Sequence, residues 1–233
     1  MTDLELRKRA AEIASQFQDK TIPDDEIIRQ VKEQPELVHA KCLSGANLFL
    51  EAVVSNRFPV ARALRDMGAD IHWTCQASVF NGNALNVART PQQADQLLEW
   101  GVEIERNLSL LITKPFKNPA IMAASHNDTT MLLYWLEKER ALFAGEPEYV
   151  REIFYAAIDM VSTMNQYNML ACVIADAELF HILKEIYSQV DNTKSIRLYL
   201  SALRHISDES LEPRKKELRK VLNAKKKELS SVT

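Results

Sequence analysis

Short amphipathic segments that come in pairs constrain the fold of this chain more than any other feature. Apolar residues recur at helical spacing, and few stretches alternate with the period of two that a strand requires. Each segment is too short to bury its apolar face alone, so such pairs normally stack on one another. The predicted helices span about 47–55 with 58–67, 83–89 with 91–100, 118–126 with 128–138, 147–163 with 167–188, and then 193–206 and 212–229.

Two further helices are predicted before these pairs. Thr2 and Glu5 have the spacing of a capping box, in which each side chain bonds the other's backbone, and they open a helix of about 15 residues. Pro23 opens the second helix, whose acidic first turn suits the positive end of the helix dipole. Pro35 ends it, because proline cannot continue the backbone hydrogen bonding.

Three of the pairs share a pattern of asparagine, alanine and glycine. Each begins at an asparagine, and the starts lie 36 and 35 residues apart: Asn47, Asn83 and Asn118. A small alanine follows each start and allows close approach of neighbouring helices: Ala52, Ala88 and Ala123. Gly68 and Gly101 close the first two pairs, where glycine permits the left-handed conformation that ends a helix.

These segments resemble the ankyrin repeat, whose period is about 33 residues and whose signature contains T-P-L-H-x-A. Residues 47–50 (N-L-F-L) occupy the T-P-L-H place, and residues 68–70 match the family's G-A-D ending. The second copy, from residue 83, is three residues shorter between its alanine and its glycine. The third keeps Pro119, but Glu139 stands where glycine is expected. With a degenerate opening repeat upstream, the resemblance covers about residues 25–140.

The fold that this resemblance implies is all-α. We expect an ankyrin-type helix-pair solenoid over residues 1–190, with an N-terminal capping helix, and a basic helical C-terminal extension over residues 191–233. A solenoid of another helix-pair family is the competing interpretation.

Motifs for catalysis are absent from the sequence. Its five glycines cannot form the phosphate-binding patterns G-x-G-x-x-G or G-x-x-x-x-G-K-[ST], and no G-x-S-x-G presents a nucleophilic serine. None of the five histidines forms H-E-x-x-H or lies beside a cysteine pair at zinc-ligand spacing. The three cysteines are too widely spaced for a disulfide framework. We therefore expect no enzyme, no catalytic residue, no metal and no cofactor.

The resemblance implies a protein–protein interaction module that binds through its inter-repeat loops and the exposed face of each first helix. The loop after Gly68 is enlarged and carries His72, Trp73 and Phe80. Neither aromatic residue has an evident duty in packing the repeat, and tryptophan is enriched at interface hot spots. We therefore predict that these three residues contact a protein partner. The alternative for Trp73 and Phe80 is a loop that folds back onto the repeats, and the apolar loop between residues 101 and 118 has the same two interpretations.

On the first helix of the third copy, the family geometry places Met122 and His126 on the concave face. These two residues complete the predicted partner contacts.

The C-terminal segment differs from the remainder in charge. Residues 211–233 carry a net charge of +5 and the other 210 residues −8, and leucines at helical spacing make the segment an amphipathic basic helix. We favour a cap that covers the last repeat. The alternative is a scaffold that is anchored to nucleic acid or to a membrane through this helix. The acidic remainder makes general nucleic-acid binding unfavourable.

The sequence also bears on location. The charged N-terminus does not resemble a signal peptide, and no apolar run reaches the roughly 18–20 residues of a membrane-spanning helix. We expect a cytoplasmic protein without a transmembrane segment. Shortened, divergent repeats resemble those of bacterial and viral host-interaction proteins, which implies the host cytosol if the chain is a secreted effector.

Overall fold

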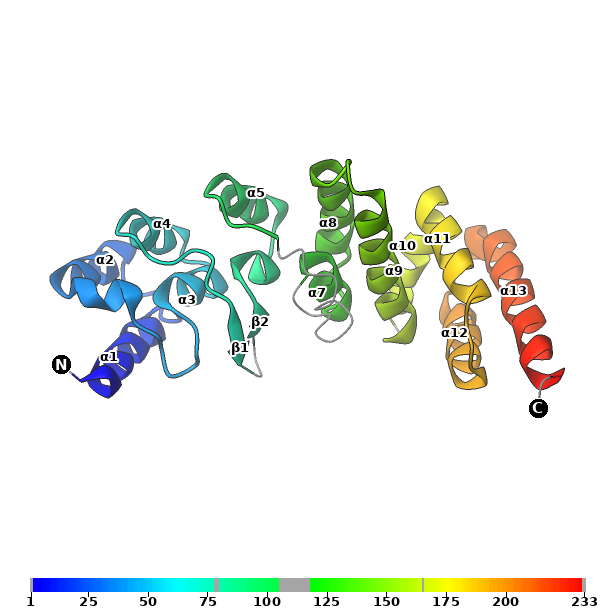
Figure 1. The fold of residues 1–233 in the computed structure, drawn as a ribbon, viewed down its shortest axis with the longest axis horizontal. Coiled ribbons are helices and arrows are strands. Elements are labelled where there is room, and N and C mark those ends of the chain that lie inside the picture. Colours follow the sequence, from blue (N-terminus) through cyan, green and yellow to red (C-terminus); the bar gives the residue numbers. More distant parts are fainter. Residues whose placement is uncertain (1, 78–79, 105–117, 165, 232–233) are drawn as a thin grey trace. The chain divides into compact units, whose positions relative to one another are not determined.

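Helices dominate the computed structural model, which describes residues 2–77, 80–104, 118–164 and 166–231 (Figure 1). This confirms the predicted all-α class. The described residues also include a short antiparallel hairpin that the sequence analysis did not predict, formed by β1 (Cys75–Ala77) and β2 (Phe80–Gly82). The chain divides into two compact units, Met1–Arg106 and Asn107–Thr233. No helix among the described residues combines the length and apolar character needed to cross a membrane.

This division differs from the predicted boundary at residue 190. The last two helices contact α9, α10 and α11 and so belong to the second unit. Their apolar stripes explain the difference, because Ile196 and Leu203 of α12 and Leu218 and Leu222 of α13 are fully buried. The basic segment therefore covers its neighbours as a cap would, and it is no separate extension.

The helices of the first unit begin and end near the predicted residues. They are α1 (Asp3–Gln16), α2 (Asp24–Glu33), η1 (Pro35–His39), α3 (Leu48–Val54), α4 (Phe58–Asp66), η2 (Ala84–Val87) and α5 (Pro91–Glu99). The capping box of Thr2 and Glu5 is present at α1. Gly68 and Gly101 follow the second helix of their pairs with φ of 92° and 91°. These are left-handed values that favour glycine.

The second unit contains both short and long helices. They are α7 (Pro119–Ser125), α8 (Thr129–Leu142), α9 (Pro147–Thr163), α10 (Tyr167–Ala175), α11 (Ala177–Ser188), α12 (Thr193–His205), η4 (Glu209–Leu211) and α13 (Glu212–Ser231). The single helix predicted over residues 167–188 is wrong. Asp176 divides it, because its side chain accepts hydrogen bonds from the backbone of Glu178 and Leu179 and so caps a new helix, α11.

The turns within the first and third pairs are equivalent. Asn56 and Asn127, which lie 71 residues apart like Asn47 and Asn118, both adopt positive φ, 56° and 58°. After each, a backbone N–H closes back onto the alanine of its pair: Arg57 onto Ala52 at 2.8 Å, and Asp128 onto Ala123 at 3.0 Å. The same left-handed turn therefore joins α3 to α4 and α7 to α8.

The second pair lacks this turn. Its first helix is reduced to η2, a 3₁₀-helix of four residues. Two residues separate Ala88 from α5, whereas five separate Ala52 from α4. The three residues missing from this copy are therefore the end of the first helix and the left-handed turn.

The asparagine that starts each pair makes the same two kinds of bond. Its side-chain oxygen accepts from the backbone at the start of the first helix, and its amide nitrogen donates to the second helix or to the residues just after it. The acceptors of the amide are the carbonyl of Asp70 for Asn47 at 2.7 Å, the carbonyl of Glu103 for Asn83 at 2.8 Å, and the carboxyl of Glu139 for Asn118 at 2.9 Å. Each asparagine thus ties its two helices together.

Candidate functional site

The predicted contact residues of the first unit lie around two adjacent turns. His72 is exposed, and its backbone N–H donates to the Asp70 carboxylate at 2.9 Å. Trp73 is half-buried, and its indole N–H donates to the carbonyl of Gly45 at 3.1 Å. This bond gives Trp73 a contact within the first unit. Phe80 lies in β2, but its side chain falls outside the described residues, as does the loop over residues 105–117.

The turn that Trp73 contacts is itself a small hairpin. Cys42 donates its backbone N–H to the carbonyl of Ala46 at 2.8 Å, and Leu43 at the tip is 55% exposed. The thiol of Cys75 lies 3.8 Å from the carbonyl of Ser44, so this turn and the β1–β2 hairpin are in contact. An exposed leucine, a half-buried tryptophan and an exposed histidine therefore occupy neighbouring positions on the first unit.

The two predicted residues of the third pair differ in accessibility. His126 follows α7 and is exposed. Met122, expected on an accessible face, is only 8% exposed and offers little surface to a partner. The cause is the packing of α7 against both α8 and α9, which covers more of this short helix than one neighbour would.

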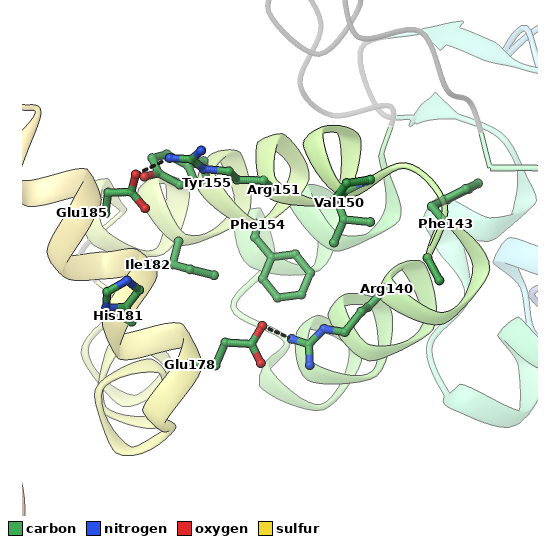
Figure 2. Close-up of a pocket in the computed structure, with 12 residues that line it drawn as sticks. Arg140, Phe143, Val150, Arg151, Phe154, Tyr155, Glu178, His181, Ile182 and Glu185 are labelled. Atoms are coloured by element: carbon green, nitrogen blue, oxygen red, sulfur yellow. Dashed lines mark hydrogen bonds and ion pairs between the residues drawn. The ribbon is translucent and has the colours of Figure 1, made fainter.

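The second unit contains a groove that the sequence analysis did not identify (Figure 2). It lies between α8, α9 and α11 and has a volume of about 470 Å³. The residues that line it are Arg140, Phe143, Ala144, Pro147, Val150, Arg151, Phe154, Tyr155, Glu178, His181, Ile182 and Glu185. We call it the α8–α9–α11 groove.

Apolar side chains line the middle of the groove, and ion pairs flank it. Figure 2 shows Phe154 and Ile182 between the two pairs, with Val150 to one side. Arg140 bonds Glu178 at 2.8 Å, and its guanidinium lies 5.0 Å from the centre of the Phe154 ring. Arg151 bonds Glu185 in the same way across α9 and α11, as the dashed lines show. An apolar side chain entering the groove would therefore meet carbon atoms in its middle and charged groups at both ends.

Two titratable groups of the groove, Tyr155 and Glu185, influence each other's pKa. The Tyr155 hydroxyl beside it lowers the pKa of Glu185, and the charge of Arg151 acts in the same direction. Burial raises the pKa of Tyr155, and the neighbouring carboxylate of Glu185 acts in the same direction. The carboxylate therefore stays ionised and the phenol stays neutral near pH 7. Such a pair is poorly suited to exchanging a proton with a substrate, because general acids and bases work best with a pKa near the operating pH.

Two further features of the described residues bear on their reactivity. No three histidine, cysteine, aspartate or glutamate side chains among them gather as a metal site would require. Cys42 is buried, and burial raises the pKa of its thiol to about 12, so the nucleophilic thiolate is disfavoured.

No local spacing in the sequence could have revealed the groove. Arg140 and Glu178 are 38 residues apart, and Arg151 and Glu185 are 34 apart. Their pairing depends on how α11 packs against α8 and α9. The only sequence signal is the mixture of arginine and aromatic residues on one face of α9, which is also typical of an ordinary exposed helix.

Two comparisons with known proteins found no match. No protein-family model matches the chain, and no curated protein matches it.

Proposed function

We propose that this chain is a non-catalytic protein-interaction module built on ankyrin-type repeats. The asparagine that recurs at the start of three successive helix pairs carries this proposal. In each pair its side-chain oxygen caps the first helix, while its amide nitrogen bonds the second helix or the residues just after it. A turn followed by two antiparallel helices is the unit of the ankyrin repeat, and the β1–β2 hairpin precedes the second pair in this way.

The proposed partner is a protein, bound through two surfaces. The first contains Leu43, His72 and Trp73 on the adjacent turns of the first unit, where tryptophan supplies a large rigid contact. The second is the α8–α9–α11 groove, whose aromatic residues and arginines are the residue types enriched at protein interfaces. Stacked repeats bind partners on extended surfaces of this kind.

Site-specific photo-crosslinking tests the proposal and separates the two surfaces. A benzophenone amino acid replaces exposed His72 in one variant and exposed His181, at the groove, in another. Exposed Arg62 on α4 serves as the matched control. In an extract of the producing cells, we expect the same protein to crosslink to one or both histidine positions and not to the control. Equal labelling at all three positions, or none at either histidine, would contradict the proposal.

Trp73 provides the sharper test of the first surface once a partner is captured. We expect Trp73→Ala to weaken binding about 30-fold, since truncation of a hot-spot aromatic costs about 2 kcal/mol or more. Trp73→Phe keeps most of the apolar contact and loses only the bond to Gly45, so its affinity should fall much less. Affinity and thermal midpoint are measured together for both variants. Unchanged affinity in a folded Trp73→Ala protein would remove Trp73 from the interface.

A further inference from the structure

Both arginines of α13 and the buried Lys215 are engaged within the fold. Arg214 donates to the carbonyl of Ala175 at 2.6 Å, at the end of α10. Arg219 bonds Glu212 at 2.6 Å. Lys215 is 4% exposed and donates to the carbonyl of Ile206 at 2.9 Å. These three cations hold the helix in place and are not available to a partner.

Four other lysines of α13 are exposed, and all but Lys226 share one side of the helix. Lys216, Lys220 and Lys227 are exposed and are spaced four and seven residues apart, which places them on one side of the helix. Buried Leu218 and Leu222 occupy the opposite side. We call these three residues the lysine face.

The carboxylates of the same helix are bound to other cations. Glu212 pairs with Lys215 and Arg219, Glu217 bonds Lys184 of α11, and Glu228 pairs with Lys225 at 2.9 Å. None of these described pairs includes a residue of the lysine face. Three positive charges therefore lie along about 17 Å of helix, from the 1.5 Å rise per residue, without a carboxylate of α13 bonded to them.

We infer that the lysine face binds an acidic protein segment rich in aspartate and glutamate. Lysine ammonium groups are hydrated point charges that attract carboxylates without demanding a fixed geometry. The net charge of −8 on residues 1–210 repels an acidic partner elsewhere and so directs it to this helix. The inferred site does not depend on the turns or groove of the proposed function.

Two other anionic partners fit the face less well. Nucleic acid is read through arginine forks and aromatic stacking, but both arginines of α13 are engaged within the fold, and the helix contains no aromatic residue. Stable membrane docking of a surface helix needs apolar side chains that enter the bilayer. Among the described residues, none of the large apolar side chains that are exposed belongs to α13.

Fluorescence anisotropy with a labelled deca-glutamate peptide tests the inference on the full chain. The test variant is Lys216→Gln, Lys220→Gln and Lys227→Gln together. The matched control removes three exposed cations of the first unit, Lys8→Gln, Lys32→Gln and Arg62→Gln, and so changes the net charge equally. We expect the peptide affinity to fall about tenfold or more in the test variant, because three exposed ion pairs are lost. It should change less than about twofold in the control and weaken with added salt.

A second variant separates lost charge from lost structure. Replacing the same three lysines with arginine preserves the charges and should preserve peptide affinity. Equal losses in the glutamine variant and its control, absence of deca-glutamate binding, or failure of the arginine variant would each overturn the inference. The same titrations with a 20-base-pair DNA duplex and with phosphatidylcholine vesicles containing phosphatidylserine supply the remaining outcome. If either probe bound more tightly than the peptide, and if this binding were lost in the glutamine variant, the lysine face would be assigned to that partner instead.

Discussion

Replacing Glu139 with glutamine is expected to remove a large pH dependence from the stability of the second unit. Glu139 and Asn118 are both fully buried, and the amide of Asn118 donates to both carboxyl oxygens at 2.9 Å. Burial raises the pKa of Glu139 to about 8, against a weaker opposing effect of the hydrogen bonds from Asn118 and the backbone of Ala120. The native state therefore retains a proton that the unfolded chain releases.

The direction follows from this difference in bound protons. Between pH 4.5, the model-peptide value, and pH 8 the folded protein binds more protons than the unfolded chain, so the free energy of unfolding falls as pH rises. The stabilising contribution is complete below pH 4.5 and is lost as pH rises through about 8. Glutamine has nearly the same shape, accepts the Asn118 bond and does not ionise. Relative to Glu139→Gln, the wild type should lose about 1.4 kcal/mol per pH unit between pH 4.5 and 8, and on the order of 5 kcal/mol by pH 9.

Urea unfolding at pH 5, 7 and 9 measures this effect. Hydrogen exchange over residues 119–163 shows whether it arises in the second unit. Glu137→Gln is the matched control, because Glu137 is an exposed carboxylate on the same helix, α8. The control should follow the wild-type profile at every pH. If the Glu139→Gln profile also ran parallel to the wild type, Glu139 would not be the group that titrates.

Glu139 also shows which part of the structure could be predicted from the sequence and which part could not. Its position corresponds to Gly68, since each follows its asparagine by 21 residues. In the first pair, glycine ends α4 and frees the backbone carbonyl of Asp70 for Asn47. Without glycine, α8 continues to Leu142 and its carbonyls remain within the helix. The sequence shows the exception, but only the packed structure shows that a carboxyl side chain replaces the missing carbonyl.

Local signals predicted the elements that depend on neighbouring residues. Capping asparagines fixed the starts of α3 and α7, and left-handed glycines fixed the ends of α4 and α5. The β1–β2 hairpin was missed, because three-residue strands carry too few residues to show a period of two. The break at Asp176 was missed because the apolar period continues across it.

The candidate binding surfaces depend on contacts between distant residues and were predicted less completely. Loop length and residue type point to His72 and Trp73. The structure places them beside the turn of residues 41–47, which neither signal indicates. The α8–α9–α11 groove requires three helices to be packed before its ion pairs exist. Sequence spacing carries no information about such pairs, because nothing periodic links α11 to α8 or α9.

Replacing Arg57 with methionine is expected to destabilise the first unit by about 3–5 kcal/mol, the range for removing one partner of a buried charge network. Arg57 is 7% exposed, and its guanidinium donates to the carbonyls of Phe17 at 3.1 Å and Ile22 at 3.0 Å. It also bonds the carbonyl of Asp19 and pairs with the carboxylate of Asp24 at 2.8 Å. Methionine keeps an unbranched apolar stem like that of arginine but leaves these acceptors without a donor in a buried region.

Arg29→Met is the matched control for Arg57→Met, because Arg29 also pairs with two acidic groups, Glu26 and Glu33, but with its side chain 58% exposed. Exposed pairs contribute little, so this variant should lose less than about 1 kcal/mol. Guanidinium unfolding compares the stabilities of the two variants. Hydrogen exchange over residues 3–33 should become faster in Arg57→Met only, because the bonds of Arg57 connect the loop between α1 and α2 to the start of α4. Equal destabilisation by both variants would mean that the buried network contributes no more than surface ion pairs do.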